Sequence, residues 1–377
     1  MQTLSAPQGN FHLSLYPRRP KETLRAWDAA DEYLLRHLQQ HNLLSEGCRI
    51  LIVNDSFGAL TTALHQWQPT MVSDSWLAHT ATQANYRDNN LDPTQLQLCD
   101  SLHWPQTTPQ LILFKVPKSL AMLEDQLIQI RQLMGPDTIL LAAGMVKQIH
   151  SSTLQLFEKH IGSTQTSLAQ KKARLILPEL NPTLTRIESP YPSRYGLEGT
   201  DLDLINHAGV FSRDSLDIGT RFMLQHLPQT KTFQRIIDLG CGNGVLGIVS
   251  AMQHPEAELT FVDESFMATA SAQTNFQQAF GDSRTAQFIN TDCLSGIAEN
   301  SADLILNNPP FHQQTTVGDF IARQMFKQAR QVLQSRGELW VVGNRHLGYH
   351  IMLKKLFGQC QTVASNRKFV ILRAVKR

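Results

Sequence analysis

Short apolar runs alternate with longer amphipathic segments along both halves of the chain. In the second half, apolar runs predict strands that begin at Arg235, Glu258, Ala286, Ala302 and Gly337. The segments between them have apolar residues at helical spacing, for example over residues 266–281 and 320–337. Gly337 is expected to end the second of these helices. Strands that alternate with helices predict βα units and a mostly parallel sheet, which is the α/β class.

The first half runs through the same order of blocks as the second. CRILIVNDSFGAL resembles QRIIDLGCGNGVLG, and PQLILFKVPKS resembles ADLILNNPPF. The offset between the halves is nearly constant, from Asp100 with Asp292 to Lys115 with Asn308. Several blocks matched in order predict two copies of one domain rather than a solenoid. The alternative is a chance likeness between two αβ segments.

A polar, proline-rich stretch, residues 178–194, separates the two copies and suits a linker or an edge hairpin. We place the boundary near residue 188, which predicts domains of residues 1–188 and 189–377. A chain of 377 residues is long enough for two such domains.

Composition excludes several classes of protein. With 42% hydrophobic and 18% charged residues the chain is globular, and a net charge of +2 does not by itself indicate a nucleic-acid partner. Five cysteines without a C-x-x-C pair indicate reduced thiols rather than disulfides or a zinc site, and no metal is expected. No signal peptide or membrane-length apolar run is visible, so we expect a cytoplasmic protein without a membrane partner.

A glycine-rich turn follows the first strand of the second copy. In IIDLGCGNGVLG, Asp238 ends the strand and Gly240, Gly242 and Gly244 follow. Glycines there let a ligand approach the backbone closely. A carboxylate at this place would repel a pyrophosphate but could accept hydrogen bonds from an ammonium group. S-adenosyl-L-methionine, which has an ammonium and a sulfonium but no phosphate, fits this pattern.

Two further acids end the next two strands. Asp263 lies where a carboxylate can bind ribose hydroxyls, and Asp292 could accept from an adenine amino group. Alone, each acid is more often a helix N-cap or a solvated loop residue than a ligand, but the loop and both acids in this order indicate a cofactor site. The first copy keeps only Gly58, with Ile52 or Asn54 near the position of Asp238, so we expect it to bind no S-adenosylmethionine.

The tetrapeptide Asn308-Pro309-Pro310-Phe311 follows the fourth strand, at the sheet edge where ligands bind. The lone pair of a planar exocyclic amine is delocalised, which makes the nitrogen a poor nucleophile. Hydrogen bonds from its two N–H groups to the Asn308 side chain and the Pro309 carbonyl would turn the lone pair toward the methyl group. Phe311 could stack on an aromatic base. The alternative is a proline-rich turn with Phe311 in the core.

These motifs give the chain a specific resemblance. The second half resembles class I methyltransferases that modify exocyclic amines through an Asn-Pro-Pro-Phe/Tyr motif. The whole chain is similar to the bacterial ribosomal RNA guanine-N2 methyltransferases, and most to those of the large subunit. The resemblance implies two tandem Rossmann-like methyltransferase domains with seven-stranded, mostly parallel sheets, the N-terminal one degenerate. It also implies S-adenosyl-L-methionine as cofactor and transfer to the N2 amine of one guanine in 23S ribosomal RNA.

The resemblance also assigns roles to residues. Asp238, Gly240, Gly242 and Gly244 would line the cofactor, with Asp263 at the ribose and Asp292 at the adenine. Asn308 and Pro309 would hold the guanine amine, and Phe311 would stack on the base.

The first copy has Lys115-Val116-Pro117-Lys118 in place of the tetrapeptide. We expect Lys115 and Lys118 to contact phosphates, so that the first domain holds the RNA while the second acts. The RNA could be protein-free or part of a partly assembled large subunit, and the target guanine would have to leave any stack.

Other substrates use the same motif chemistry. They are a guanine of small-subunit ribosomal RNA, a protein glutamine amide and a DNA adenine, although no DNA partner is expected. A non-catalytic RNA-binding or assembly factor would leave the intact glycine loop and tetrapeptide unexplained.

Overall fold

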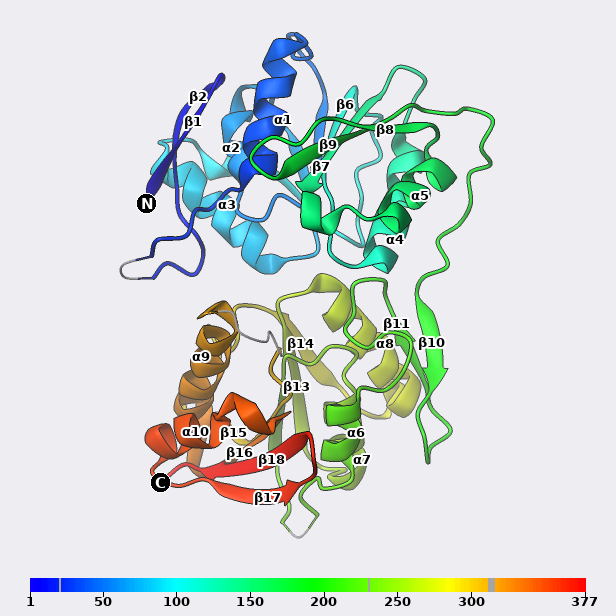
Figure 1. Cartoon of the computed structure of the whole chain (residues 1–377). Helices are drawn as coiled ribbons and strands as arrows, with labels where there is room; N and C mark the ends of the chain where they lie inside the picture. Colours follow the sequence, from blue (N-terminus) through cyan, green and yellow to red (C-terminus); the bar gives the residue numbers. More distant parts are fainter. Residues whose placement is uncertain (20–21, 230, 311–315) are drawn as a thin grey trace. The chain divides into compact units, whose positions relative to one another are not determined.

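The computed structural model describes residues 1–19, 22–229, 231–310 and 316–377. The chain forms two compact units, Met1–Tyr191 and Pro192–Arg377, and the expected boundary near residue 188 lies close to this division (Figure 1). Among the described residues, no helix is both long and apolar enough to cross a membrane.

The first unit is built on a seven-stranded sheet in the order β5-β4-β3-β6-β7-β9-β8. Neighbouring strands from β5 to β7 are parallel, and β9 is antiparallel to both β7 and β8. The strands are β3 (Ile50–Val53), β4 (Thr70–Ser73), β5 (Gln97–Asp100), β6 (Leu111–Lys115), β7 (Ile139–Met145), β8 (Thr164–Thr166) and β9 (Ala173–Pro178). The helices are α1 (Ala29–Gln40), α2 (Ala59–Ala63), α3 (Trp76–Asp88), α4 (Leu120–Leu133) and α5 (Ser151–His160).

The second unit repeats this sheet in the order β14-β13-β12-β15-β16-β18-β17. Strands β14 to β16 are parallel, and β18 is antiparallel to both neighbours. The strands are β12 (Arg235–Leu239), β13 (Glu258–Asp263), β14 (Ala286–Asn290), β15 (Ala302–Asn307), β16 (Leu333–Asn344), β17 (Gln361–Ser365) and β18 (Phe369–Val375). The helices are α6 (Ile218–Leu224), α7 (Val245–Gln253), α8 (Phe266–Phe280), α9 (Thr316–Val332) and α10 (Tyr349–Phe357). The predicted pair of seven-stranded, mostly parallel sheets is confirmed.

Helices cover both faces of the second sheet, because successive strand residues point to opposite faces. Ile236 and Leu304 pack with α7 and α8 in one buried cluster, whereas Ile237 and Ile305 pack with α9 and α10 in another. Figure 1 shows α9 and α10 on one side of this sheet and α7 and α8 on the other. A strand buried on both faces explains the uninterrupted apolar runs in the sequence.

The expected end of α9 is wrong. The helix ends at Val332, and Gly337 lies inside β16 rather than after the helix. Arg336 adopts the left-handed backbone conformation, with φ of 65°. A Cβ atom at Gly337 would lie 2.9 Å from the Gln334 carbonyl oxygen, so the glycine permits a close backbone approach within the strand.

Two hairpins extend the units beyond the predicted elements. In the first unit, β1 (Gln2–Ala6) pairs with β2 (Gly9–Leu13), and in the second β10 (Ser193–Gly196) pairs with β11 (Asp203–Asn206). Asn243 of the glycine loop donates through Nδ2 to Tyr195 Oη and Asn206 Oδ1, at 3.2 and 2.9 Å. The second hairpin therefore supports the loop between β12 and α7.

The proline-rich stretch between the copies has no regular structure from Glu179 to Pro192 and packs along α4. The Arg131 guanidinium donates to the carbonyl oxygens of Asn181 and Leu184, and the Ser189 hydroxyl donates to Asp125 at 2.5 Å. These bonds attach the stretch to the first unit.

Candidate functional site

The carboxyl ends of the parallel strands β14, β13, β12 and β15 meet at one edge of the second sheet. This edge brings together the glycine loop that follows β12, Asp263 at the end of β13, Asp292 after β14 and Asn308 after β15. Pro309 follows directly and is buried. Phe311, for which we expect stacking, lies outside the described residues.

The glycine loop needs its glycines at two positions. Gly244, the N-cap of α7, has φ of 81°, and a Cβ there would lie 2.9 Å from the Ala272 Cβ, so the glycine lets α7 pack against α8. Gly242 has φ of 54°, and a Cβ there would meet nothing within 4 Å. The loop therefore exposes backbone at Gly242 with space beside it, as a ligand cradle requires.

Asp238 lies beneath this loop and is buried. Its Oδ2 accepts from the Gly247 backbone N–H at 2.8 Å, and its Oδ1 accepts from no described residue. Burial, and then the neighbouring charge of Asp263, raise the pKa of Asp238 to about 8. A cationic ligand group would favour the ionised carboxylate and lower this pKa.

Asp263 and Asp292 already have partners within the site. Asp263 accepts from the backbone N–H of Gly242 at 3.0 Å and of Ser265 at 3.1 Å, which joins β13 to the glycine loop. Burial raises the pKa of Asp263, although these hydrogen bonds act in the opposite direction. Asp292 is buried and accepts from Gln324 Nε2 at 2.7 Å. Each carboxylate keeps lone pairs that a ligand hydroxyl or amine could use.

The side chains of Asn307 and Asn308 point to different partners. Asn307 Nδ2 donates to the Leu239 carbonyl at 2.8 Å and thereby ties β15 to the start of the glycine loop. Asn308 Nδ2 donates to Thr220 Oγ1 at 2.8 Å and to Asp217 Oδ2 at 3.3 Å. Since a carboxylate is only an acceptor, Asp217 fixes which end of the Asn308 amide is the nitrogen.

Asn308 Oδ1 is buried and accepts no hydrogen bond from any described residue. A buried acceptor without a donor costs about 1–3 kcal/mol, which a ligand N–H at this place would offset. The site thus presents an open amide oxygen next to the glycine loop.

Asp217 and Thr220 also belong to this site, although the sequence did not predict them. Asp217 caps α6 by accepting from the Thr220 backbone N–H at 2.8 Å. An Asp directly before an apolar residue that opens a helical pattern, here Asp217 before Ile218, is a helix-start signal that could have identified the cap. The link from this cap to Asn308 joins residues far apart in the sequence and has no local signal.

The first unit keeps the backbone of the loop but has no acid at the positions of Asp238 and Asp263. Asn54 N donates to Val72 O at 2.9 Å, as Gly240 N donates to Val262 O at 2.8 Å. Asn54 therefore corresponds to Gly240, which places Ile52 at the position of Asp238 and Ser73 at that of Asp263. Gly58, like Gly244, is a left-handed N-cap.

One correspondence expected between the copies is wrong. Asp100 pairs with Ser73, and Asn290 pairs with Asp263, so Asp100 corresponds to Asn290 rather than to Asp292. Asp292 lies in the loop after β14, whereas Asp100 lies within β5. Matching the two aspartates by sequence alone therefore shifted the correspondence by two residues.

Lys115, the counterpart of Asn308, forms an internal ion pair. Its Nζ donates to Asp28 Oδ1 at 2.7 Å and to Asp31 Oδ1 at 2.6 Å. Burial acts to lower the pKa of Lys115, but the two aspartates raise it overall, and burial raises the pKa of Asp31 to about 6. The phosphate contact expected for Lys115 is therefore wrong, whereas Lys118 is exposed.

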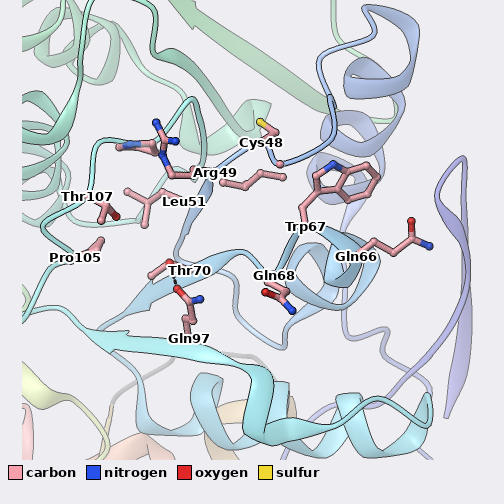
Figure 2. A pocket seen from close by; sticks show the side chains of 13 residues that line it. Cys48, Arg49, Leu51, Gln66, Trp67, Gln68, Thr70, Gln97, Pro105 and Thr107 are labelled. Atoms are coloured by element: carbon pink, nitrogen blue, oxygen red, sulfur yellow. Dashed lines mark hydrogen bonds between the residues drawn. The ribbon is translucent and has the colours of Figure 1, made fainter.

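The first unit has a hollow of about 430 Å³ at the amino ends of its strands (Figure 2). Its lining includes the starts of three strands, at Ile50, Thr70 and Gln97, together with Trp67 and Arg49. The Thr70 hydroxyl donates to Gln97 Oε1 at 2.8 Å within it. Because it lies at the amino ends of the strands, it does not correspond to the edge that carries the glycine loop in the second unit.

Comparison with known families matches both units. The family model described as RLMG N-terminal domain matches residues 1–182, and the one described as methyltransferase small domain matches residues 201–373. The second match spans the glycine loop and Asn308.

Among solved structures, the chain is similar to the T. thermophilus 16S rRNA N2 G1207 methyltransferase (RsmC), solved in complex with AdoMet and guanosine. The TM-score is 0.78 and the identity 20%, over 100% of this chain and 98% of that chain. At this identity the likeness concerns the fold, and it extends over both units.

Whole-length relatives are much closer in sequence. The ribosomal RNA large subunit methyltransferase G of Aeromonas salmonicida (strain A449) is 50% identical, and the alignment covers 100% of both chains. The proteins of the same name from Streptomyces avermitilis and Pseudomonas aeruginosa (strain UCBPP-PA14) are each 48% identical, with 99% and 100% of both chains covered. The chain therefore belongs to the ribosomal RNA large subunit methyltransferase G family.

Proposed function

We propose that this protein transfers the methyl group of S-adenosyl-L-methionine to the N2 amine of a guanine in 23S ribosomal RNA. The observation that carries the proposal is the open Oδ1 of Asn308 beside a glycine loop that is itself bound by Asp263. The first provides an acceptor for an amine, and the second a cradle for the methyl donor. The names of the full-length relatives support ribosomal RNA of the large subunit as the substrate.

The residues at the edge fit this cofactor. Asp238 Oδ1 is a buried acceptor without a described partner, and the space beside Gly242 admits a ligand against the backbone. Asp263 and Asp292 would accept from the ribose hydroxyls and the adenine amine. When bound, the cofactor supplies an electrophilic methyl group and positive charge that the acids of the site favour.

Asn308 and Pro309 prepare the acceptor. The Asn308 Oδ1 and the Pro309 carbonyl would each accept one N–H of the guanine amine, which draws the nitrogen toward tetrahedral geometry and frees its lone pair. Phe311 would stack on the guanine ring. These residues act by positioning, and no strong base is required before the product proton leaves.

The first unit would hold the RNA through a different set of lysines than we expected. Lys118 follows β6, Lys147 follows β7 and Lys172 precedes β9, so all three gather at the carboxyl edge of β6 and β7. The Val146 N–H donates to the Lys172 carbonyl at 2.8 Å, which makes two of these turns adjacent. The three side chains, which we call the edge lysines, are exposed, and none forms an ion pair with a described residue.

The test is methyl transfer from labelled S-adenosylmethionine to protein-free 23S RNA and, separately, to large subunits lacking the modification. Products are digested to nucleosides, and Asn308→Ala is compared with Gln287→Ala, an exposed amide on β14. We expect abundant labelled N2-methylguanosine from the wild type and Gln287→Ala, and only a small residual amount from Asn308→Ala.

Label at another place would redirect the proposal. If 23S RNA stays unlabelled, the same assay is run on 16S RNA, DNA and protein; label there in guanine, in adenine or in a glutamine amide would contradict the 23S assignment while leaving the amine chemistry intact. Equal product from Asn308→Ala would contradict the assigned pocket.

A further inference from the structure

Asn308 is held by two side chains of one helix start. Its Nδ2 lies 2.8 Å from Thr220 Oγ1 and 3.3 Å from Asp217 Oδ2. Asp217 is the N-cap of α6, so the same carboxylate oxygen also accepts the Thr220 backbone N–H. The two acceptors therefore belong to one capped turn and keep a fixed spacing.

The turn itself has little room to move. Gly219 lies between the two acceptors, and a Cβ there would be 3.0 Å from Asp217 Oδ2 and 3.1 Å from the Phe369 ring. Thr220 is buried, with 6% of its surface exposed. The start of α6 is thus packed closely against β18, and its acceptors form a rigid support for Asn308.

The same turn occurs in the first unit with different chemistry. Asp28 is the N-cap of α1, and Asp31 stands three residues later, as Thr220 does after Asp217. Both aspartates accept from Lys115, which corresponds to Asn308. The contact between a capped helix start and the end of the fourth strand is therefore present in both copies, although two of its three side chains differ.

We propose that Asp217 and Thr220 are positioning residues for methyl transfer, because they hold the Asn308 amide nitrogen and leave Oδ1 for the substrate amine. This inference rests on the proposed function. A reversed amide would bring its oxygen against the Asp217 carboxylate and its N–H groups against those of the guanine amine. Both contacts are repulsive, so the Asp217 carboxylate selects the orientation that can bind substrate, and the Thr220 hydroxyl accepts from the amide nitrogen in that orientation.

Thr220→Val tests this directly, because valine keeps the shape of threonine but removes the hydroxyl acceptor. Thr220→Ser keeps the hydroxyl and is the matched control. We expect Thr220→Val to lower kcat about tenfold, the loss of one hydrogen bond, with little change in KM or in the affinity for S-adenosylmethionine. Thr220→Ser should restore kcat to within about twofold of the wild type.

A second variant covers the case in which Thr220→Val does not fold. Asp217→Ser preserves a helix cap but is too short to reach Asn308, so kcat should again fall while cofactor affinity stays. The double variant Thr220→Val with Asn308→Ala should have the same residual kcat as Asn308→Ala alone, because Thr220 acts through Asn308.

The outcomes separate the two proposals. A wild type that makes no N2-methylguanosine in 23S RNA would overturn the proposed function, and this inference with it. An active wild type whose kcat is unchanged by Thr220→Val and Asp217→Ser would overturn the positioning role alone. A kcat loss in Thr220→Val that Thr220→Ser shares, or that adds fully to Asn308→Ala, would also overturn it.

Discussion

Lys115 and Asn308 occupy the same place in two corresponding sheets, and each donates to the capped helix start beside it. Lys115 forms ion pairs with two aspartates, whereas Asn308 keeps its Oδ1 without a hydrogen-bond donor among the described residues. At this contact, the site that can accept a substrate amine and the site closed by an ion pair differ in the strand-end side chain and in one of its two partners, Asp31 in place of Thr220.

Replacing Lys115 by methionine should destabilise the first unit. The change leaves Asp28 and Asp31 without their cation, and Asp31 has only 7% of its side chain exposed. We expect a loss of about 3 kcal/mol in the free energy of unfolding, near the lower end for broken buried pairs because Asp28 is half exposed. Urea unfolding measures it, with Lys118→Met as a control that should change little. Equal stability of both variants would show that the ion pair contributes nothing.

Asp238 should make stability depend on pH. Its pKa of about 8 lies above the value in the unfolded chain, so the folded state binds the proton more tightly. This contribution to stability is complete below about pH 4 and is lost progressively as the pH rises to about 8. The melting temperature of Asp238→Asn minus that of the wild type should therefore increase from about pH 4 to about pH 8. Above about pH 8 this difference should stay constant. Glu256→Gln, a change on the exposed surface, is the control.

Asp263→Asn should weaken cofactor binding. The change removes a charge near the ligand and weakens the bond to Gly242 N–H. We expect the dissociation constant for S-adenosylmethionine to rise at least about tenfold, as for a lost charge-assisted hydrogen bond, measured by titration calorimetry. Ser73→Ala, the corresponding position of the first unit, is the control and should leave the constant unchanged. An effect of Ser73→Ala as large as that of Asp263→Asn would indicate that the first unit binds the cofactor as well.

Changing the edge lysines together to glutamine should reduce the salt dependence of RNA binding. Three lost phosphate contacts would lower the slope of log K against log salt by about 2–3. The measurement is the affinity for a 23S RNA fragment across a range of salt concentrations. Lys159→Gln, which removes a lysine already paired with Glu124 at 2.6 Å, should change the slope little. An unchanged slope in the triple variant would place the RNA elsewhere.

Much of the fold could be predicted from the sequence because both sheets are buried on two faces. Apolar runs predicted β12, β13, β14 and β15 at their observed starts. Since the ends of these parallel strands meet at one edge of the sheet, the acids that end or follow them could be predicted to lie together. The end of α9 was misplaced because a glycine after a helical pattern suggests a cap, whereas Gly337 serves a close approach inside β16.

The parts that failed depend on contacts distant in sequence. Lys115 was interpreted as a free cation because Asp28 and Asp31 lie far before it and come near only through the packing of α1. Thr220 was missed for the same reason with respect to Asn308. Composition and periodicity identify what an element is, but not which side chain of another element it meets.

The left-handed turns at Gly58 and Gly244 carry an implication for the history of the chain. A Cβ at Gly58 would lie 2.6 Å from the Thr82 hydroxyl, so the first copy still requires this glycine although Ile52 and Ser73 stand in place of Asp238 and Asp263. After a gene duplication, residues kept only for a ligand are free to drift, while those that fit one helix against another remain under selection. Gly58 is therefore still needed for the first copy to fold, although this copy has lost the acids of a cofactor site.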